Sequence, residues 1–156
     1  MFQLPIRTLD SEHSTGSSEL GQLPDWNLND LYTATDAKEL IRDLNWLEKE
    51  CNEFAKSYEG KLHTLSDKEM LTCIVRNEKI SSISGRIISY AGLLYYQKTT
   101  DADRAKFLSD MQEKITVFTT KLVFFSLEIN SLEDDFLDKL FTKNDQLARY
   151  KPVFEK

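Results

Sequence analysis

The sequence has 156 residues, of which 40% are hydrophobic and 29% charged, and its formal net charge is −6. That apolar fraction is enough for one hydrophobic core, which excludes wholesale disorder. Acidic and basic residues interleave along the chain, which disfavours a nucleic-acid-binding surface, because such surfaces cluster Lys and Arg. We therefore expect one domain.

The N-terminal stretch falls into two parts. Residues 1–22 are rich in Ser and Gly without a sustained period, and we expect a flexible lead-in. They contain no basic region followed by an apolar core, so we expect a cytoplasmic protein rather than a secreted one. Further on, Trp26, Leu28 and Leu31 stand between turn formers, and we expect them to dock onto helices. A binding role for Trp26 is the alternative.

The first helix is expected over residues 36–58. A capping sequence begins at Asp36, and Gly60 is a typical residue just after a last helical turn. Apolar residues recur at spacings of three and four, a seam suited to antiparallel helix packing. They are Leu40, Leu44, Leu47, Cys51, Phe54 and Tyr58.

The second helix is expected over residues 66–97 and organises the domain. Its start is marked by a capping box from Ser66 to Glu69, and no proline interrupts it. One side carries apolar residues, and a second side is made of small ones. We expect this helix to be covered on both sides, with another backbone close to the small residues. The apolar set is Cys73, Ile80, Ile83, Ile87, Tyr90, Ala91 and Leu94, and the small set is Ser82, Gly85, Ser89 and Gly92.

The third helix is expected from a cap at Thr100–Asp101 to about Asn130, on the cleanest heptad of the chain. With short loops, the three long helices predict an all-α antiparallel bundle. The heptad residues are Leu108, Met111, Ile115, Phe118, Leu122, Phe125 and Ile129.

One or two shorter helices should follow, the first over residues 132–141 and a further amphipathic pattern from Leu147. That pattern is still open at Lys156, so we expect a chain that continues in its parent protein. We also expect exposed apolar residues that await a partner, namely Phe124, Leu147, Val153 and Phe154.

No catalytic, cofactor-binding or metal-binding residue is predicted in this chain. His13 and His63 lack acidic or histidine neighbours at ligand spacing, and we expect both at the surface. Cys51 and Cys73 fall on apolar helix positions, which favours two reduced core thiols over a disulfide or metal pair. There is no H-E-x-x-H sequence and no glycine-rich phosphate loop.

Four segments nevertheless resemble one family. PDWNLNDLY at residues 24–32 resembles the P-x-W-D-L-x-D-L-Y opening of oligoendopeptidase F-type zinc metallopeptidases, with Asn27 in place of the usual acid. YEGKL at residues 58–62, SYAGLLY at residues 89–95 and FFSLEIN at residues 124–130 are similar to segments that follow in that family, in the same order.

The resemblance covers about residues 23–156 and implies the helical N-terminal domain of a longer enzyme that hydrolyses short peptides. In that family the zinc ligands are two histidines of H-E-x-x-H and a downstream glutamate, in a catalytic domain that this chain lacks. This chain would then form one wall of the substrate cleft and be inactive alone. Its implied partners are the missing catalytic domain and oligopeptide substrates. The alternative is an autonomous helical interaction module without catalysis.

Overall fold

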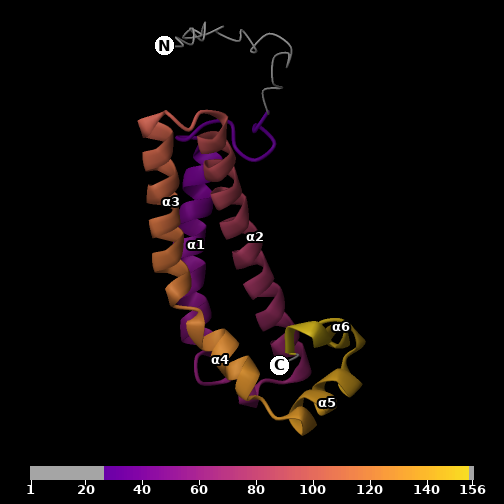
Figure 1. The fold of residues 1–156 in the computed structure, drawn as a ribbon. Helices are drawn as coiled ribbons and strands as arrows, with labels where there is room; N and C mark the ends of the chain where they lie inside the picture. The colour runs from indigo at the N-terminus through magenta and orange to yellow at the C-terminus, as the bar shows by residue number, and fades with distance from the viewer. Residues whose placement is uncertain (1–26, 155–156) are drawn as a thin grey trace, which may run out of the picture.

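A computed structural model describes residues 27–154, and within that range every regular element is a helix. Three long helices run antiparallel, and shorter ones continue from the lower end of the bundle (Figure 1). The all-α prediction is confirmed for this range, while the lead-in over 1–22 and Trp26 lie outside it. The elements are α1 (Lys38–Tyr58), η1 (Leu62–Thr64), α2 (Asp67–Gln97), α3 (Ala102–Thr120), α4 (Val123–Ser131), α5 (Asp134–Lys143), α6 (Asp145–Ala148) and η2 (Lys151–Phe154).

Helix α2 is the centre of the bundle and packs against both α3 and α1. The predicted seams supply the core, because one residue in each turn of the three helices points between them. Leu44, Ile83 and Leu94 are partly buried at its margin. The buried seam residues are Leu40, Leu47, Cys51, Phe54 and Tyr58 in α1, Cys73, Ile80, Ile87, Tyr90 and Ala91 in α2, and Met111 and Ile115 in α3.

The start of α2 is confirmed as a capping box. The Ser66 N–H donates to Glu69 Oε2 at 2.9 Å, and the Glu69 N–H donates to Ser66 Oγ at 3.4 Å. These bonds satisfy two backbone donors of the first turn. The hydrogen bonds from Ser66, with the backbone N–H first, lower the pKa of the Glu69 carboxyl.

The start of α1 differs from the prediction. Helix α1 begins at Lys38, its N-cap is Ala37, and no side chain caps it. The reason is a preceding turn, in which the Ala37 N–H donates to the Ala34 carbonyl at 3.2 Å and Ala37 itself is buried. Asp36 is therefore left exposed in the turn. The predicted stop is confirmed, since Gly60 has φ +74°, the left-handed conformation that favours glycine.

The predicted third helix is two helices. Helix α3 ends at Thr120 and α4 begins at Val123, with the Leu122 N–H bonded to the Thr119 carbonyl at 2.9 Å in a tight turn. Three threonine hydroxyls in this region donate to the carbonyl four residues earlier, an interaction that bends helices. The heptad seam continues across the break, because Phe125 and Ile129 remain buried.

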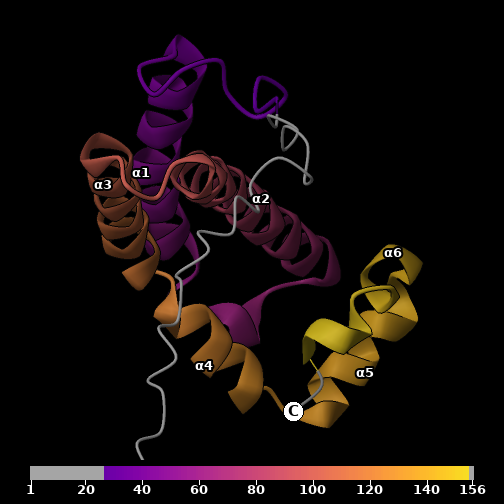
Figure 2. The same ribbon diagram turned by 45° about the horizontal axis from the view of Figure 1, so that its top comes forward.

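Two short helices, α5 and α6, follow α4 as predicted, and a single 3-10 element, η2, comes after them. Helices α5 and α6 pack back towards the first half of α2, as Figure 2 shows from a second direction. The Tyr150 hydroxyl donates to Glu78 on α2 at 2.9 Å. This return buries Leu147 and Phe154, so their predicted exposure is wrong, whereas Val153 is 43% exposed as expected. The Phe154 ring instead meets Phe141 at 5.4 Å.

The small-residue side of α2 is not covered by the described residues. Ser82, Gly85 and Ser89 are exposed, and a Cβ added at Gly85 would meet no atom within 4 Å. The prediction that a second backbone lies against this side is therefore wrong within residues 27–154. The apolar side of α2 is occupied by α1 and α3, and its first half is also contacted by α5 and α6.

Candidate functional site

The residues considered as catalytic or metal-binding candidates do not come together in the described part of the structure. His63 is exposed in η1, His13 lies outside the described residues, and Asp134 and Asp135 stand in the first turn of α5. Within residues 27–154 no group of three or more His, Cys, Asp or Glu side chains could hold a metal ion. The absence of a bound cofactor stays a prediction.

The two cysteines are buried and unlinked, which agrees with the predicted core thiols. Burial raises the pKa of Cys51 to about 11 and that of Cys73 to about 12. Because the thiolate is the nucleophile and the metal ligand, a protonated buried thiol does neither task at neutral pH. Both residues act as small apolar side chains.

The four segments that carry the family resemblance meet in pairs, and the first pair joins residues 24–32 to residues 89–95. The Tyr32 ring lies edge-on to the Tyr90 ring at a centroid distance of 5.4 Å, and both are buried. The Tyr32 hydroxyl donates to Asp43 Oδ2 at 2.8 Å, which raises the pKa of Tyr32 together with burial, the larger cause. This pair fixes the N-terminal segment on α1 and α2.

Asp43 is a buried carboxylate whose partners are all present. Besides the bond from Tyr32, Asp43 Oδ1 accepts a hydrogen bond from the Arg42 guanidinium at 3.1 Å, and Asp43 Oδ2 lies 3.7 Å from the Arg86 guanidinium. The Arg86 guanidinium stands over the Tyr32 ring at 4.5 Å and donates to the Leu31 carbonyl. A buried carboxylate with this many donors is a satisfied structural network rather than a free acid.

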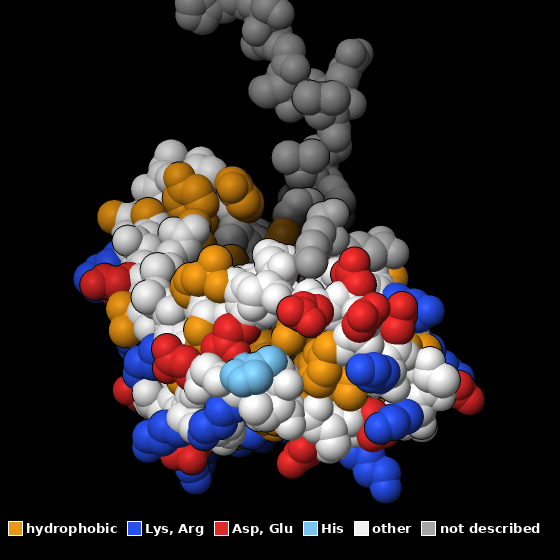
Figure 3. Space-filling view, turned by 90° about the horizontal axis from the view of Figure 1, so that it is seen from below, with side chains coloured by type: hydrophobic (Ala, Val, Ile, Leu, Met, Phe, Trp, Pro, Cys, Tyr) orange, Lys and Arg blue, Asp and Glu red, His pale blue; other side chains and the backbone are white. Residues whose placement is uncertain are grey.

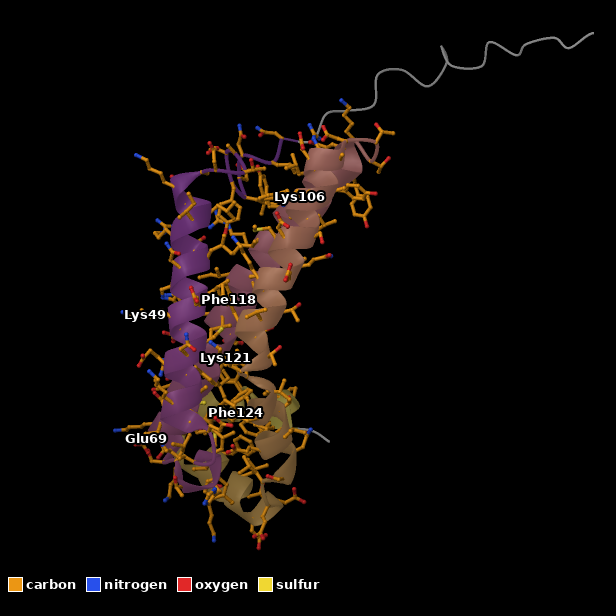
Figure 4. The ribbon with its side chains drawn as sticks, turned by 90° about the vertical axis from the view of Figure 1, so that its left-hand side faces the viewer. Lys49, Glu69, Lys106, Phe118, Lys121 and Phe124 are labelled. Carbon is orange, nitrogen blue, oxygen red and sulfur yellow. The ribbon has the colours of Figure 1, made fainter. Side chains whose placement is uncertain are left out.

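The second pair joins residues 58–62 to residues 124–130. The N–H groups of Gly60 and Leu62 donate to the two oxygens of the Glu128 carboxylate, at 2.5 and 3.3 Å. On the same side of α4, the Phe124 ring lies 6.1 Å from the Phe54 ring, and Figure 4 shows Phe124 where α4 faces α1. Phe124 is thus partly buried, and its predicted role as an exposed off-seam residue is wrong.

The same region is tied to α2 by a charged side chain. Arg76 donates to Glu50 Oε1 at 2.7 Å and to the Tyr58 hydroxyl at 3.4 Å. Its guanidinium also lies 5.7 Å from the Phe54 ring and 5.3 Å from the Tyr58 ring. The hydrogen bond to Glu50 is the main reason that the pKa of Arg76 is raised. We call this side of α4, with Phe54, Tyr58, Phe124, Glu128 and the backbone of 60–62, the closed flank.

The opposite side of α4 borders a groove. Helix α4 diverges from α2 below the turn at Leu122, and a hollow of about 450 Å³ lies between them. Its other lining residues are uncharged Ser, Thr and Asn side chains from α2, α3 and α4. Its apolar walls are Ile80, Leu122, Phe125, Ile129 and Val153.

A second groove of about 390 Å³ follows the same side of α2 towards its C-terminus. It is lined by α2 and α3, with Gly92, Tyr96 and Leu108 among its residues, and again none is charged. Ser81, Ser84, Ile88 and Gly92 link the two grooves at spacings of three and four, which places them on one helix face. We call the two grooves together the uncharged trough.

Ser84 is the anomalous residue of the trough. It is only 9% exposed, and its Oγ is the one buried side-chain polar atom without a hydrogen-bond partner among the described residues. Other helical hydroxyls of this chain, such as that of Thr72, donate to the carbonyl four residues earlier. An unpaired buried hydroxyl costs free energy.

The outer side of α4 continues the apolar surface beyond the groove. Val123 is 54% exposed and Leu127 is 66% exposed, one turn apart. Five of the nine residues of α4 are apolar, and they are not confined to one face of the helix. Elsewhere, as at the lower end of the molecule, acidic and basic side chains alternate over the surface (Figure 3).

The sequence predicts only part of the trough. Of the predicted small residues of α2, Ser89 and Gly92 line the second groove, whereas the first groove follows Ser81 and Ser84 rather than Ser82 and Gly85. Its lower half exists because the third predicted helix breaks, and the threonine cluster before Leu122 was the signal that could have indicated the break.

No protein-family model, curated protein or solved structure matches this chain. Among the described residues, none of the helices combines the length and the apolar character that crossing a membrane would require.

Proposed function

We propose that this chain is the helical N-terminal domain of an oligoendopeptidase F-like zinc metalloendopeptidase, a cytoplasmic enzyme that hydrolyses short peptides. In this proposal the chain forms part of the substrate-cleft wall and is inactive alone. Its partners are the catalytic domain and the oligopeptide substrates of the whole enzyme.

One observation carries the proposal: the four segments that resemble the family pack in pairs. Tyr32 meets Tyr90, and Glu128 binds the backbone of Gly60 and Leu62. Both are contacts between residues far apart in the chain, 58 positions for Tyr32 and Tyr90 and 68 for Gly60 and Glu128. Such contacts are a reason for the segments to occur together in one family.

The described residues do not fit a catalytic zinc. Such a site takes three protein ligands, and His63 stands exposed without a neighbouring ligand set. The proposal therefore assigns the zinc ligands and the general base to the catalytic domain, and no chemical step is assigned to a residue of this chain. What the chain would contribute is shape.

The test begins with the reading frame that encodes this chain, in which we expect an H-E-x-x-H sequence downstream. The chain alone should not cleave a quenched fluorescent oligopeptide. Mixed with the downstream portion, it should give cleavage that a chelator abolishes and zinc restores.

Two results would contradict the proposal. Chelator-sensitive cleavage by the purified chain alone would mean that it carries its own catalytic site. A reading frame without H-E-x-x-H would favour the second candidate, an autonomous helical interaction module, which the uncharged trough also suits.

A further inference from the structure

We draw no further inference here: the strongest candidate, the uncharged trough along α2 with the exposed Val123 and Leu127 of α4 beside it, is an apolar surface for which nothing in the structure shows what covers it.

Discussion

The two sides of α4 differ in how fully their polar groups are hydrogen-bonded and how closely they are packed. On the closed flank, Glu128 accepts two backbone N–H groups and aromatic rings fill the space towards α1. On the other side, Phe125 and Ile129 border the uncharged trough, whose lining includes Ser84, a residue with a buried Oγ that has no partner among the described residues. The polar groups of the closed flank thus have hydrogen-bond partners, whereas a buried polar atom beside the trough has none among the described residues.

This difference separates residues that make the fold from residues that could serve an interaction. Charged and hydrogen-bonded side chains such as Arg76 and Glu128 hold the bundle together, each with specific partners. The floor of the trough, with Ile80, Phe125 and Ile129, belongs to the core, but its exposed residues such as Ser81 and Tyr96 contribute little to the fold. Substitutions on the closed flank should therefore cost stability, whereas substitutions of the exposed trough residues should not.

The largest effect is expected at the centre of the closed flank. Phe54 is fully buried and contacts the rings of Tyr58, Phe124 and Phe125. Phe54→Ala should lower the free energy of unfolding by about 3–5 kcal/mol, since it leaves a cavity between α1 and α4. Urea unfolding followed by circular dichroism measures this. Tyr96→Ala is the matched control in the trough, because Tyr96 is 67% exposed, and its cost should stay within about 0.5 kcal/mol.

A smaller effect is expected for the carboxylate of the closed flank. Glu128→Ala removes the acceptor of the Gly60 and Leu62 N–H groups, and the free energy of unfolding should fall by about 2 kcal/mol. The loss is limited because the exposed Gly60 N–H can donate to water instead. Amide hydrogen exchange at Leu62 should accelerate in the variant. Glu113→Gln, an exposed acid of α3, is the control and should change little. Equal losses for the two variants would mean that the carboxylate does not hold α4.

How much of this comparison the sequence could predict depends on the range of the interactions involved. The seams of α1 and α2 and the cap at Ser66 were predictable, because periodicity and capping are local. The break before Val123 is harder to predict, since the heptad continues through it and only the threonine cluster before Leu122 indicates a bend. The start of α1 was missed because a turn ending at Ala37 replaces the expected cap at Asp36.

The trough was still harder to predict. Its walls come from residues as distant as Ser81 and Val153, and they border one hollow only because α4 leaves α2 and the C-terminal segment returns. The same return buries Leu147 and Phe154, which had been expected to be exposed. Which apolar residues stay exposed is decided by these long-range arrangements and not by local pattern.

The buried thiols predict how the free energy of unfolding depends on pH. Burial is the largest cause and raises the pKa of both thiols, against the positive charges of Arg76 near Cys73 and Lys121 near Cys51, which lower it. From about pH 8 to pH 11 the unfolded thiols, with a pKa of about 8.5, release protons that the folded thiols keep. The folded state then binds more protons, so the free energy of unfolding falls as pH rises.

We expect a loss of about 1–2 kcal/mol between pH 8 and pH 9 from the two thiols together. Urea unfolding at both pH values measures it, and the Cys51→Ala/Cys73→Ala variant should lose correspondingly less over the same interval. Tyr32 and Tyr90, whose pKa values are also raised by burial, remain in that variant and contribute the residual slope. An unchanged slope would mean that water reaches the thiols.

The smallest expected effect has the opposite sign and lies in the trough. Ser84→Ala removes a hydroxyl whose Oγ is buried without a partner, and alanine has the higher helix propensity. The free energy of unfolding should therefore rise by about 0.5–1 kcal/mol in the isolated chain. The matched control is Thr72→Ala in the same helix, where the hydroxyl donates to the Lys68 carbonyl at 2.9 Å and is exposed, so any gain from propensity alone appears there. A gain at Ser84 that exceeds the gain at Thr72 measures the cost of the unpaired hydroxyl. A loss of stability at Ser84 would mean that Oγ has a partner in the isolated chain.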